Sequence, residues 1–378
     1  MINFIKYKYY IIKNKIRNLL YKLKLIQYNS MNRDVISSNT MTGKVIMGYQ
    51  GWFGCPDDSS TLNTWRHWCR EDGRSSVDIY PDVSELSEEE LYLTPDGKKV
   101  YSSYHSATNI RHFKWMKDYN LDGVFLQRFV TDFPIKNILN TVLLDVMAGS
   151  SIYGRVFAIM YDVTNASADN LLELLTDDWQ SLKVLDSTQY LQHNNKPVVG
   201  IWGLGFVDQD VNTKQAADII NYFKNKGYTV VGGVPAYWRT LDRDSQSNPE
   251  WSEVYKLFDI ISPWTVGRYK DNKTANNFIV NNVLADIKES KEYLPVIFPG
   301  YSAHNLQGTA LDEIPRKDGS FYMNQSTNIT SVGCSMVYVA MFDECDEATA
   351  IYKTLEYGDK YLKLTNKIGK MLRGENYD

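Results

Sequence analysis

The sequence has little cysteine: four residues, Cys55, Cys69, Cys334 and Cys345, among 378. They are too few and too scattered for a disulfide scaffold, and no CxxC pair or Cys/His cluster has the spacing of a zinc site. No GxSxG sequence occurs, which disfavours acyl transfer. Basic charge is not in excess either, since the formal net charge is −4, so nucleic acid is not an expected partner.

Long apolar runs are also lacking, so neither a signal-peptide core nor a transmembrane span is expected. Residues 1–33 contain eight basic groups and no acidic one, and lysines interrupt the apolar stretches. Residues 1–43 are interpreted as a basic N-terminal extension, either poorly ordered or an amphipathic helix on a membrane surface that residues 1–30 would contact. Met31 and Met41 also leave a later start open. The expected location is the cytoplasm or a membrane surface.

From residue 44 onward, short β-branched apolar segments alternate with segments of helical spacing. Strands are expected at 44–49, 123–127, 155–161, 197–202, 228–234, 258–262, 294–298 and 335–342. Helices are expected at 106–119, 135–147, 168–185, 213–226, 249–257, 276–290, 320–331 and 347–357. Eight such repeats predict an α/β fold, a (β/α)8 TIM barrel over residues 44–378. A doubly wound open sheet is the alternative, disfavoured because no Gly-rich phosphate turn follows the first strand.

The connection after the first strand, residues 50–104, is too long for a simple loop and is predicted to form a lid-like insertion over the barrel mouth. In a TIM barrel the active site lies at the carboxyl ends of the strands. The candidate substrate-binding residues there are Tyr49, Gln50, Trp52, Gln127, Arg128, Tyr161, Asp162, Trp202, Trp238, Trp264, His304 and Asp343. Their amides, carboxylates and aromatic rings suit a polyhydroxylated ligand. Tyr301 also follows a strand, and His67 and His304 are more typical of ordinary hydrogen-bonding residues than of catalysts.

The last expected strand runs into four carboxylates within five residues, Asp343, Glu344, Asp346 and Glu347. Grouped carboxylates next to a buried strand repel one another and are costly to desolvate. Glu344 and Glu347 are the candidate catalytic pair, one protonated as an acid and the other ionised. Alternatively, Asp346 and Glu347 cap the expected helix at 347–357. A divalent cation is a weaker alternative, because no second carboxylate cluster or EF-hand-like glycine supports it; no metal and no cofactor are expected.

Several motifs occur in a recognisable order: GYQGWF at 48–53, WRHW at 65–68, VDIYPD at 77–82, DGVFLQRF at 122–129 and YVAMFDE at 338–344. Together they resemble bacterial proteins described as glycoside hydrolase family 71/99-like, over roughly residues 44–355. The family 99 endo-α-mannosidases are a more distant resemblance. Their catalytic segment, Phe-Asn-Glu-Trp-His-Glu-Gly-Thr/Ser-Gln-Ile, aligns without a gap with residues 342–351.

That alignment keeps both glutamates and replaces the family's Asn, Trp, His, Gly and Gln by Asp343, Cys345, Asp346, Ala348 and Ala350. The resemblance implies that Glu344 is a base that deprotonates a sugar 2-hydroxyl, whose oxygen attacks the anomeric carbon with net retention. Glu347 would be the general acid. The leading expectation is therefore a retaining glycoside hydrolase acting on an oligo- or polysaccharide. The alternatives are a non-catalytic sugar-binding barrel and a cytoplasmic enzyme of polysaccharide assembly.

Overall fold

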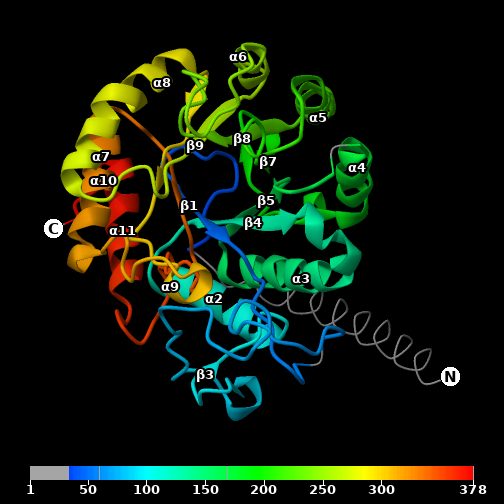
Figure 1. Cartoon of the computed structure of the whole chain (residues 1–378), viewed down its shortest axis with the longest axis vertical. Helices are drawn as coiled ribbons and strands as arrows, with labels where there is room; N and C mark the ends of the chain where they lie inside the picture. The colour runs from blue at the N-terminus through cyan, green and yellow to red at the C-terminus, as the bar shows by residue number, and fades with distance from the viewer. Residues whose placement is uncertain (1–33, 59, 168, 378) are drawn as a thin grey trace.

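A computed structural model of the chain describes residues 34–58, 60–167 and 169–377 (Figure 1). The predicted surface helix and membrane contact of the N-terminal extension fall on residues 1–33, which lie outside the described residues. Within the described ranges, no helix combines the length and the apolar character needed to cross a membrane.

One parallel sheet forms the centre of the molecule, in the order β10-β9-β8-β7-β5-β4-β1-β12-β11. Its strands are β1 (Val45–Tyr49), β4 (Gly123–Phe129), β5 (Val156–Asp162), β7 (Lys196–Trp202), β8 (Thr229–Pro235), β9 (Ile260–Trp264), β10 (Glu292–Tyr293), β11 (Val296–Ile297) and β12 (Val337–Val339). A short strand, β6 (Gln192–His193), pairs antiparallel with β7.

The two ends of this order meet in a single segment. β10 pairs with β9 and β11 pairs with β12, and only two residues, Leu294 and Pro295, separate β10 from β11. Residues 292–297 therefore act as one interrupted strand that joins both ends of the sheet. The predicted TIM barrel is confirmed, and each of its eight strands lies where a β-branched apolar run was expected.

Helices surround the sheet (Figure 1). They are α2 (Ser106–Asp118), α3 (Lys136–Tyr153), α4 (Leu171–Leu182), α5 (Thr213–Asn225), α6 (Trp251–Tyr255), α7 (Asn272–Phe278), α8 (Leu284–Glu289), α10 (Ser320–Ser331) and α11 (Lys360–Arg373), with a single turn, α9 (His304–Gln307), at the rim. Local chemistry sets their ends. The Asn212 side chain accepts the N–H of Gln215 to start α5, and Gly154 ends α3 with a left-handed φ of 63°.

The helix expected at 347–357 is wrong: the chain makes turns there, and the last helix is α11 at 360–373. Ala348 has a φ of 49°, which a right-handed helix cannot contain. The N–H groups of Ile351 and Tyr352 both donate to the carbonyl of Phe342, so the segment folds back onto the end of β12. Its apolar residues are buried in a loop, and Asp346 and Glu347 cap no helix.

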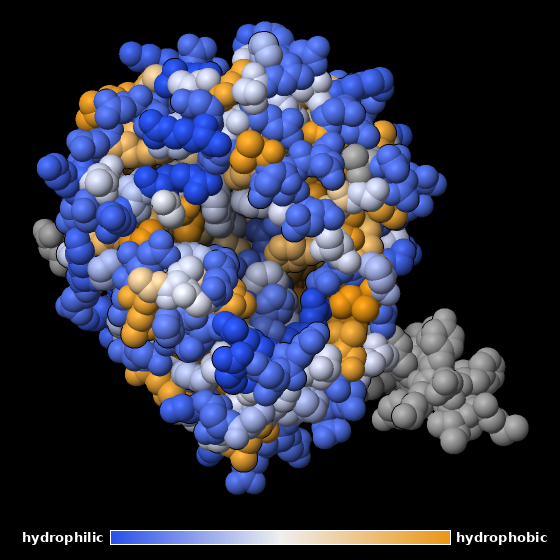
Figure 2. Space-filling model, in the orientation of Figure 1, coloured by the Kyte–Doolittle hydropathy of each residue, from blue (hydrophilic) through white to orange (hydrophobic). Residues whose placement is uncertain are grey.

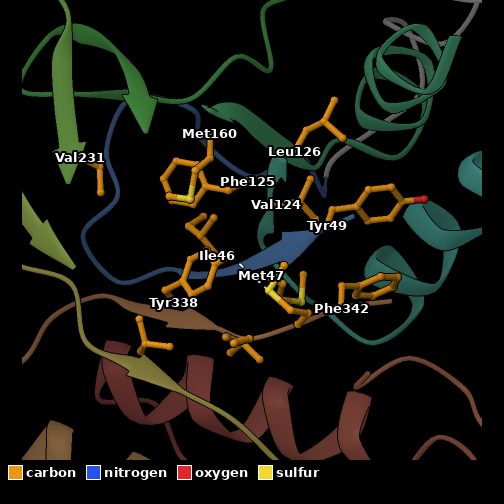
Figure 3. Packing of buried hydrophobic residues seen from close by; sticks show 14 of the residues in the cluster. Ile46, Met47, Tyr49, Val124, Phe125, Leu126, Met160, Val231, Tyr338 and Phe342 are labelled. Atoms are coloured by element: carbon orange, nitrogen blue, oxygen red, sulfur yellow. Dashed lines mark hydrogen bonds between the residues drawn. The ribbon is translucent and has the colours of Figure 1, made fainter. Parts of the chain in front are cut away.

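Side chains alternate between the inside of the barrel and the helix layer, as the two-residue period of a strand requires. Figure 3 shows Ile46, Phe125, Met160 and Tyr338 gathered inside, whereas Tyr49 points out between the helices. Gly48 also faces inward: a Cβ there would lie 2.2 Å from the Tyr338 hydroxyl oxygen. Glycine therefore leaves the barrel centre room for the Tyr338 ring.

The insertion at 50–104 contains a 3-10 turn, η1 (Glu88–Glu90), and a small hairpin of β2 (Tyr92–Leu93) and β3 (Lys99–Val100). It is fastened to the loops that follow β11 and β12. Asp78 accepts the Ser302 hydroxyl at 2.6 Å, and the N–H of Asp82 donates to the carbonyl of Lys353. The insertion thus lies beside the carboxyl ends of the last two barrel strands, in the lower part of Figure 1.

Candidate active site

Glu344 lies in the loop just after β12 and is 5% exposed. Both carboxylate oxygens accept hydrogen bonds, Oε1 from Gln50 Nε2 at 2.8 Å and Oε2 from Thr349 Oγ1 at 2.6 Å. Burial, followed by the charges of Glu347 and Asp346, raises the pKa of Glu344 well above its usual range. The two donors oppose that rise, because they stabilise the ionised carboxylate.

Glu347 is partly buried, and its carboxylate accepts no hydrogen bond from the residues that the structure describes. Burial and the charge of Asp346 raise the pKa of Glu347 from its usual 4.5 to about 7. Its backbone carbonyl accepts the N–H of Ser302, which ties this turn to the loop after β11. Glu344 and Glu347 therefore lie within electrostatic reach of each other but have opposite hydrogen-bonding surroundings.

Asp346 is 2% exposed, and its Oδ2 lies 2.7 Å from Nδ1 of His67 in the insertion. Its other oxygen, Oδ1, is buried without a partner among the described residues. The His67 ring stacks on Trp52 with centroids 3.8 Å apart and planes 4° from parallel. Phe129 also packs on Trp52, with centroids 5.2 Å apart and planes 28° from parallel, so His67 and Phe129 both pack against the Trp52 ring.

Asp343 is fully buried, and both of its carboxylate oxygens accept hydrogen bonds. It accepts the backbone N–H groups of Gln50 and Gly51 at 2.8 and 2.9 Å. Burial raises the pKa of Asp343 to about 7 despite these donors. The two hydrogen bonds to Asp343 fix the turn after β1, from which the Gln50 side chain reaches Glu344.

Other predicted residues come from β4, β5, β7 and β9 at the inside of the barrel. Gln127 donates from Nε2 to the Tyr338 hydroxyl at 2.9 Å, and burial raises the pKa of Asp162 to about 6. Trp202 and Trp264 are partly buried and meet edge to face at 5.3 Å. Figure 2 shows the face seen in Figure 1 hollowed at its centre, over the barrel. The β1–β12 side of this mouth thus carries the carboxylates, and β7 and β9 carry the two tryptophans.

Three predicted substrate-binding residues, Tyr49, Arg128 and Tyr161, are wrong because they face the helix layer. The Tyr49 hydroxyl lies 2.8 Å from both Asn109 Oδ1 and His112 Nδ1 of α2. Arg128 forms a buried, two-pronged ion pair with Asp178 of α4, at 2.7 and 2.9 Å. The Tyr161 hydroxyl donates to the same carboxylate at 2.9 Å. Each is adjacent on its strand to a residue that faces the barrel interior. Because successive side chains of a strand point to opposite faces, these three side chains face away from the interior.

Trp238 and His304 make contacts with other parts of the chain. Trp238 is buried against Tyr255 of α6, because the segment after β8 folds back over the outer helices. His304 is exposed on the rim at the start of α9, where its Nδ1 lies 2.7 Å from the carbonyl of Thr309.

Two residues beside the pair, Tyr301 and His67, lie outside the predicted substrate-binding set, although Tyr301 follows a strand and the sequence offers His67 as a weaker candidate. Tyr301 is close enough that the charge of Glu347, after burial, is the largest cause of its raised pKa. The sequence favours an ordinary hydrogen-bonding role for His67. The one sequence signal for its contact is at position 346, where Asp346 aligns with the histidine of the family 99 segment. Among the described residues, no group of three or more His, Cys, Asp or Glu is placed to hold a metal ion.

The chain shares its fold with (β/α)8 glycoside hydrolases. The structure of a glycoside hydrolase family 99 endo-α-mannosidase from Bacteroides thetaiotaomicron aligns with a TM-score of 0.64, covering 89% of this chain and 99% of that one at 15% identity. The same enzyme in complex with bis-tris propane aligns at 0.63, also at 15% identity, covering 89% and 98%. A glycoside hydrolase-like protein aligns at 0.55 and 13% identity, over 88% and 95%.

No family profile matches the sequence. No curated protein matches it either. The likeness confirms the family 99 resemblance at the level of the fold, over nearly the whole of both chains.

Proposed function

We propose that the protein is a retaining glycoside hydrolase that cleaves an oligo- or polysaccharide, with Glu344 as the base and Glu347 as the general acid. The observation that supports it is the pairing of a buried carboxylate, Glu344, with a partly buried one, Glu347, in opposite hydrogen-bonding surroundings after the last strand of a glycosidase-like barrel. A catalytic acid and base must hold different protonation states at one pH, and differing environments separate them.

Glu344 suits the base because Gln50 and Thr349 both donate to its carboxylate and so offset part of the rise in its pKa that burial and the charges of Glu347 and Asp346 cause. Glu347 suits the acid because it has no such donors and its pKa of about 7 keeps it substantially protonated near neutrality. Glu344 would take the proton of a sugar 2-hydroxyl while that oxygen attacks the anomeric carbon. Glu347 would protonate the departing glycosidic oxygen, then deprotonate the water that opens the 1,2-anhydro ring, and Glu344 would return its proton to the 2-oxygen.

The remaining mouth residues would bind the sugar. Asp162 and Gln127 offer polar groups to hydroxyls, and the Trp202 and Trp264 rings offer apolar surface to the C–H faces of a sugar. Trp202 Nε1 is buried without a partner among the described residues, so a ligand oxygen could accept its hydrogen.

A panel of α- and β-linked glycans with mass-spectrometric detection tests the proposal. Glu344→Gln and Glu347→Gln should each lower turnover by roughly 10²- to 10⁴-fold on natural glycans, while the folded structure is kept. On an aryl glycoside with an acidic leaving group, Glu347→Gln should lose less, because that leaving group needs no proton. Glu292→Gln, on β10, is the matched control. Wild-type rates in both site variants would contradict the assignment.

A non-catalytic sugar-binding barrel is the second candidate, favoured by one observation. Glu344 is almost entirely buried with both oxygens held inside the protein, and Cys345 beside it is bonded to Tyr352. Calorimetric binding of glycans with no cleavage across the panel would support this function over hydrolysis.

A further inference from the structure

Asp346 stands between the two glutamates in the sequence and is joined to a part of the chain 279 residues away. Its contact, His67, comes from the insertion after β1, and the 2.7 Å separation from Nδ1 to Oδ2 is that of a strong, charge-assisted hydrogen bond. Asp346 is more than nine-tenths buried, with Oδ1 lacking a partner among the described residues. His67 therefore supplies the hydrogen bond that this buried carboxylate has.

The His67 ring is itself held in place. It lies flat on Trp52 and meets Phe53 edge to face at 5.9 Å, so its plane and the direction of Nδ1 are set by packing. A neutral imidazole that donates from Nδ1 leaves Nε2 unprotonated. The arrangement resembles carboxylate–histidine pairs in which a hydrogen bond from one residue fixes the orientation and charge of the other, which in turn acts on a third group.

We propose that His67 and Asp346 are a positioning pair: His67 holds Asp346 as a buried carboxylate, and that negative charge keeps the proton on Glu347 until the leaving oxygen takes it. The inference rests on the proposed function, since Glu347 is the acid only in that mechanism. Asp346 contributes through its charge and does not touch the sugar, so it is a positioning residue.

The charges around Glu347 support the roles proposed for His67 and Asp346. Besides burial, Asp346 is the cause that raises the pKa of Glu347. The other ionisable groups facing the turn are Asp343 and Glu344 on the same loop, Tyr301 and Glu313 from the loops after β11, Tyr338 of β12, and Arg316, which donates to the carbonyls of Ala348 and Ala350. Arg316 is thus turned toward backbone oxygens and leaves the negative charge of Asp346 in place.

The test measures the protonation of Glu347 with and without substrate. In ¹³C-labelled protein, the Glu347 carboxyl signal, assigned by its loss in Glu347→Gln, gives a titration midpoint. Asp346→Asn should move that midpoint to lower pH by roughly 1 pH unit, and the alkaline limb of kcat should move with it. His67→Phe, which keeps a ring to stack on Trp52, should move both in the same direction, and the double variant should move them no further. His67→Gln, which can still donate, should restore part of the change.

A second pair of the same kind provides the control. His193 Nε2 lies 2.7 Å from Glu292 Oε2, far from the site in the fold, between β6 and β10. Glu292→Gln should leave the Glu347 midpoint and the kcat profile unchanged. An unmoved midpoint in Asp346→Asn would overturn the inference, as would an equal loss of kcat at every pH. If the wild type cleaves no glycan, the proposed function fails, but the titration still decides whether Asp346 holds the proton on Glu347.

Discussion

Replacing Asp162 with asparagine should stabilise the protein at neutral and alkaline pH but not in acid. Asp162 is 8% exposed, and its Oδ1 accepts the N–H of Thr164 at 2.8 Å, a bond that an amide oxygen can also accept. Burial raises the pKa of Asp162 from its usual 3.8 to about 6. The folded state therefore holds a proton that the unfolded chain has already lost between these two values.

The sign and size follow from that difference. A raised carboxyl pKa gives full stability below the unfolded value and loses it as the pH rises through the folded value. Above pH 6 the loss amounts to about 3 kcal/mol of unfolding free energy, which an uncharged amide at the same position does not suffer. The gain of Asp162→Asn over wild type should thus grow by about 2 kcal/mol between roughly pH 4 and pH 8, the rest of the difference falling below pH 4.

Urea unfolding of both proteins across that range gives the difference at each pH. Asp218→Asn, on the exposed side of α5, controls for the exchange of a carboxylate for an amide, since its ion pair with Lys214 is worth at most about 1 kcal/mol. Stability curves of Asp162→Asn and wild type that stay parallel would refute the reasoning. Glycan cleavage by Asp162→Asn should fall while stability rises, because a group that binds substrate is retained at a cost to folding.

Three further substitutions distinguish residues that stabilise the helix layer from residues that bind ligand at the barrel mouth. Arg128→Met should cost about 3–5 kcal/mol of unfolding free energy by leaving Asp178 buried and unpaired, with no change in glycan affinity by calorimetry; a selective loss of affinity would return Arg128 to the site. Tyr49→Phe should cost about 1–3 kcal/mol, measured by urea unfolding, and leave KM unchanged, since among the described residues its hydroxyl forms hydrogen bonds with Asn109 and His112 of α2. Trp202→Ala should weaken glycan binding by roughly tenfold with little loss of kcat, and unchanged binding would remove Trp202 from the sugar contacts.

The barrel was predictable because burial on both faces imposes one composition on every strand. Each run of Val, Ile and Phe had to be short, apolar throughout and followed by a helical period, as in β5 and β8. The final helix was not predictable in the same way. Ile351 and Tyr352 are as apolar as a helix face, but they bury themselves by folding back on Phe342. The apolar content of a segment predicts that it is buried, but it does not predict which backbone hydrogen bonds the buried segment forms.

The errors at the site share one cause. The predicted residues come in adjacent pairs at strand ends, Gln127 with Arg128 and Tyr161 with Asp162, although adjacent residues on a strand face opposite sides. Applying the two-residue period keeps Gln127 and Asp162, which face the barrel interior, and removes their neighbours. The contact between His67 and Asp346 lies beyond such a rule, because no local pattern links residues so far apart in the chain.

Several polar atoms at the mouth are buried without hydrogen-bond partners among the described residues. Asp343 is as buried as any residue, yet two backbone N–H groups satisfy it, so its burial secures the turn after β1. Gln50 Oε1, Trp52 Nε1, Trp202 Nε1 and Asp346 Oδ1 are buried with no such partner among the described residues. An unmet buried polar group costs roughly 1–3 kcal/mol, and a ligand that forms hydrogen bonds with the groups at the mouth would offset that cost. These atoms include both hydrogen-bond donors and acceptors, and they lie beside partly exposed tryptophans. A sugar fits such surroundings, because its hydroxyl groups donate and accept hydrogen bonds at the ring edge and its faces are apolar.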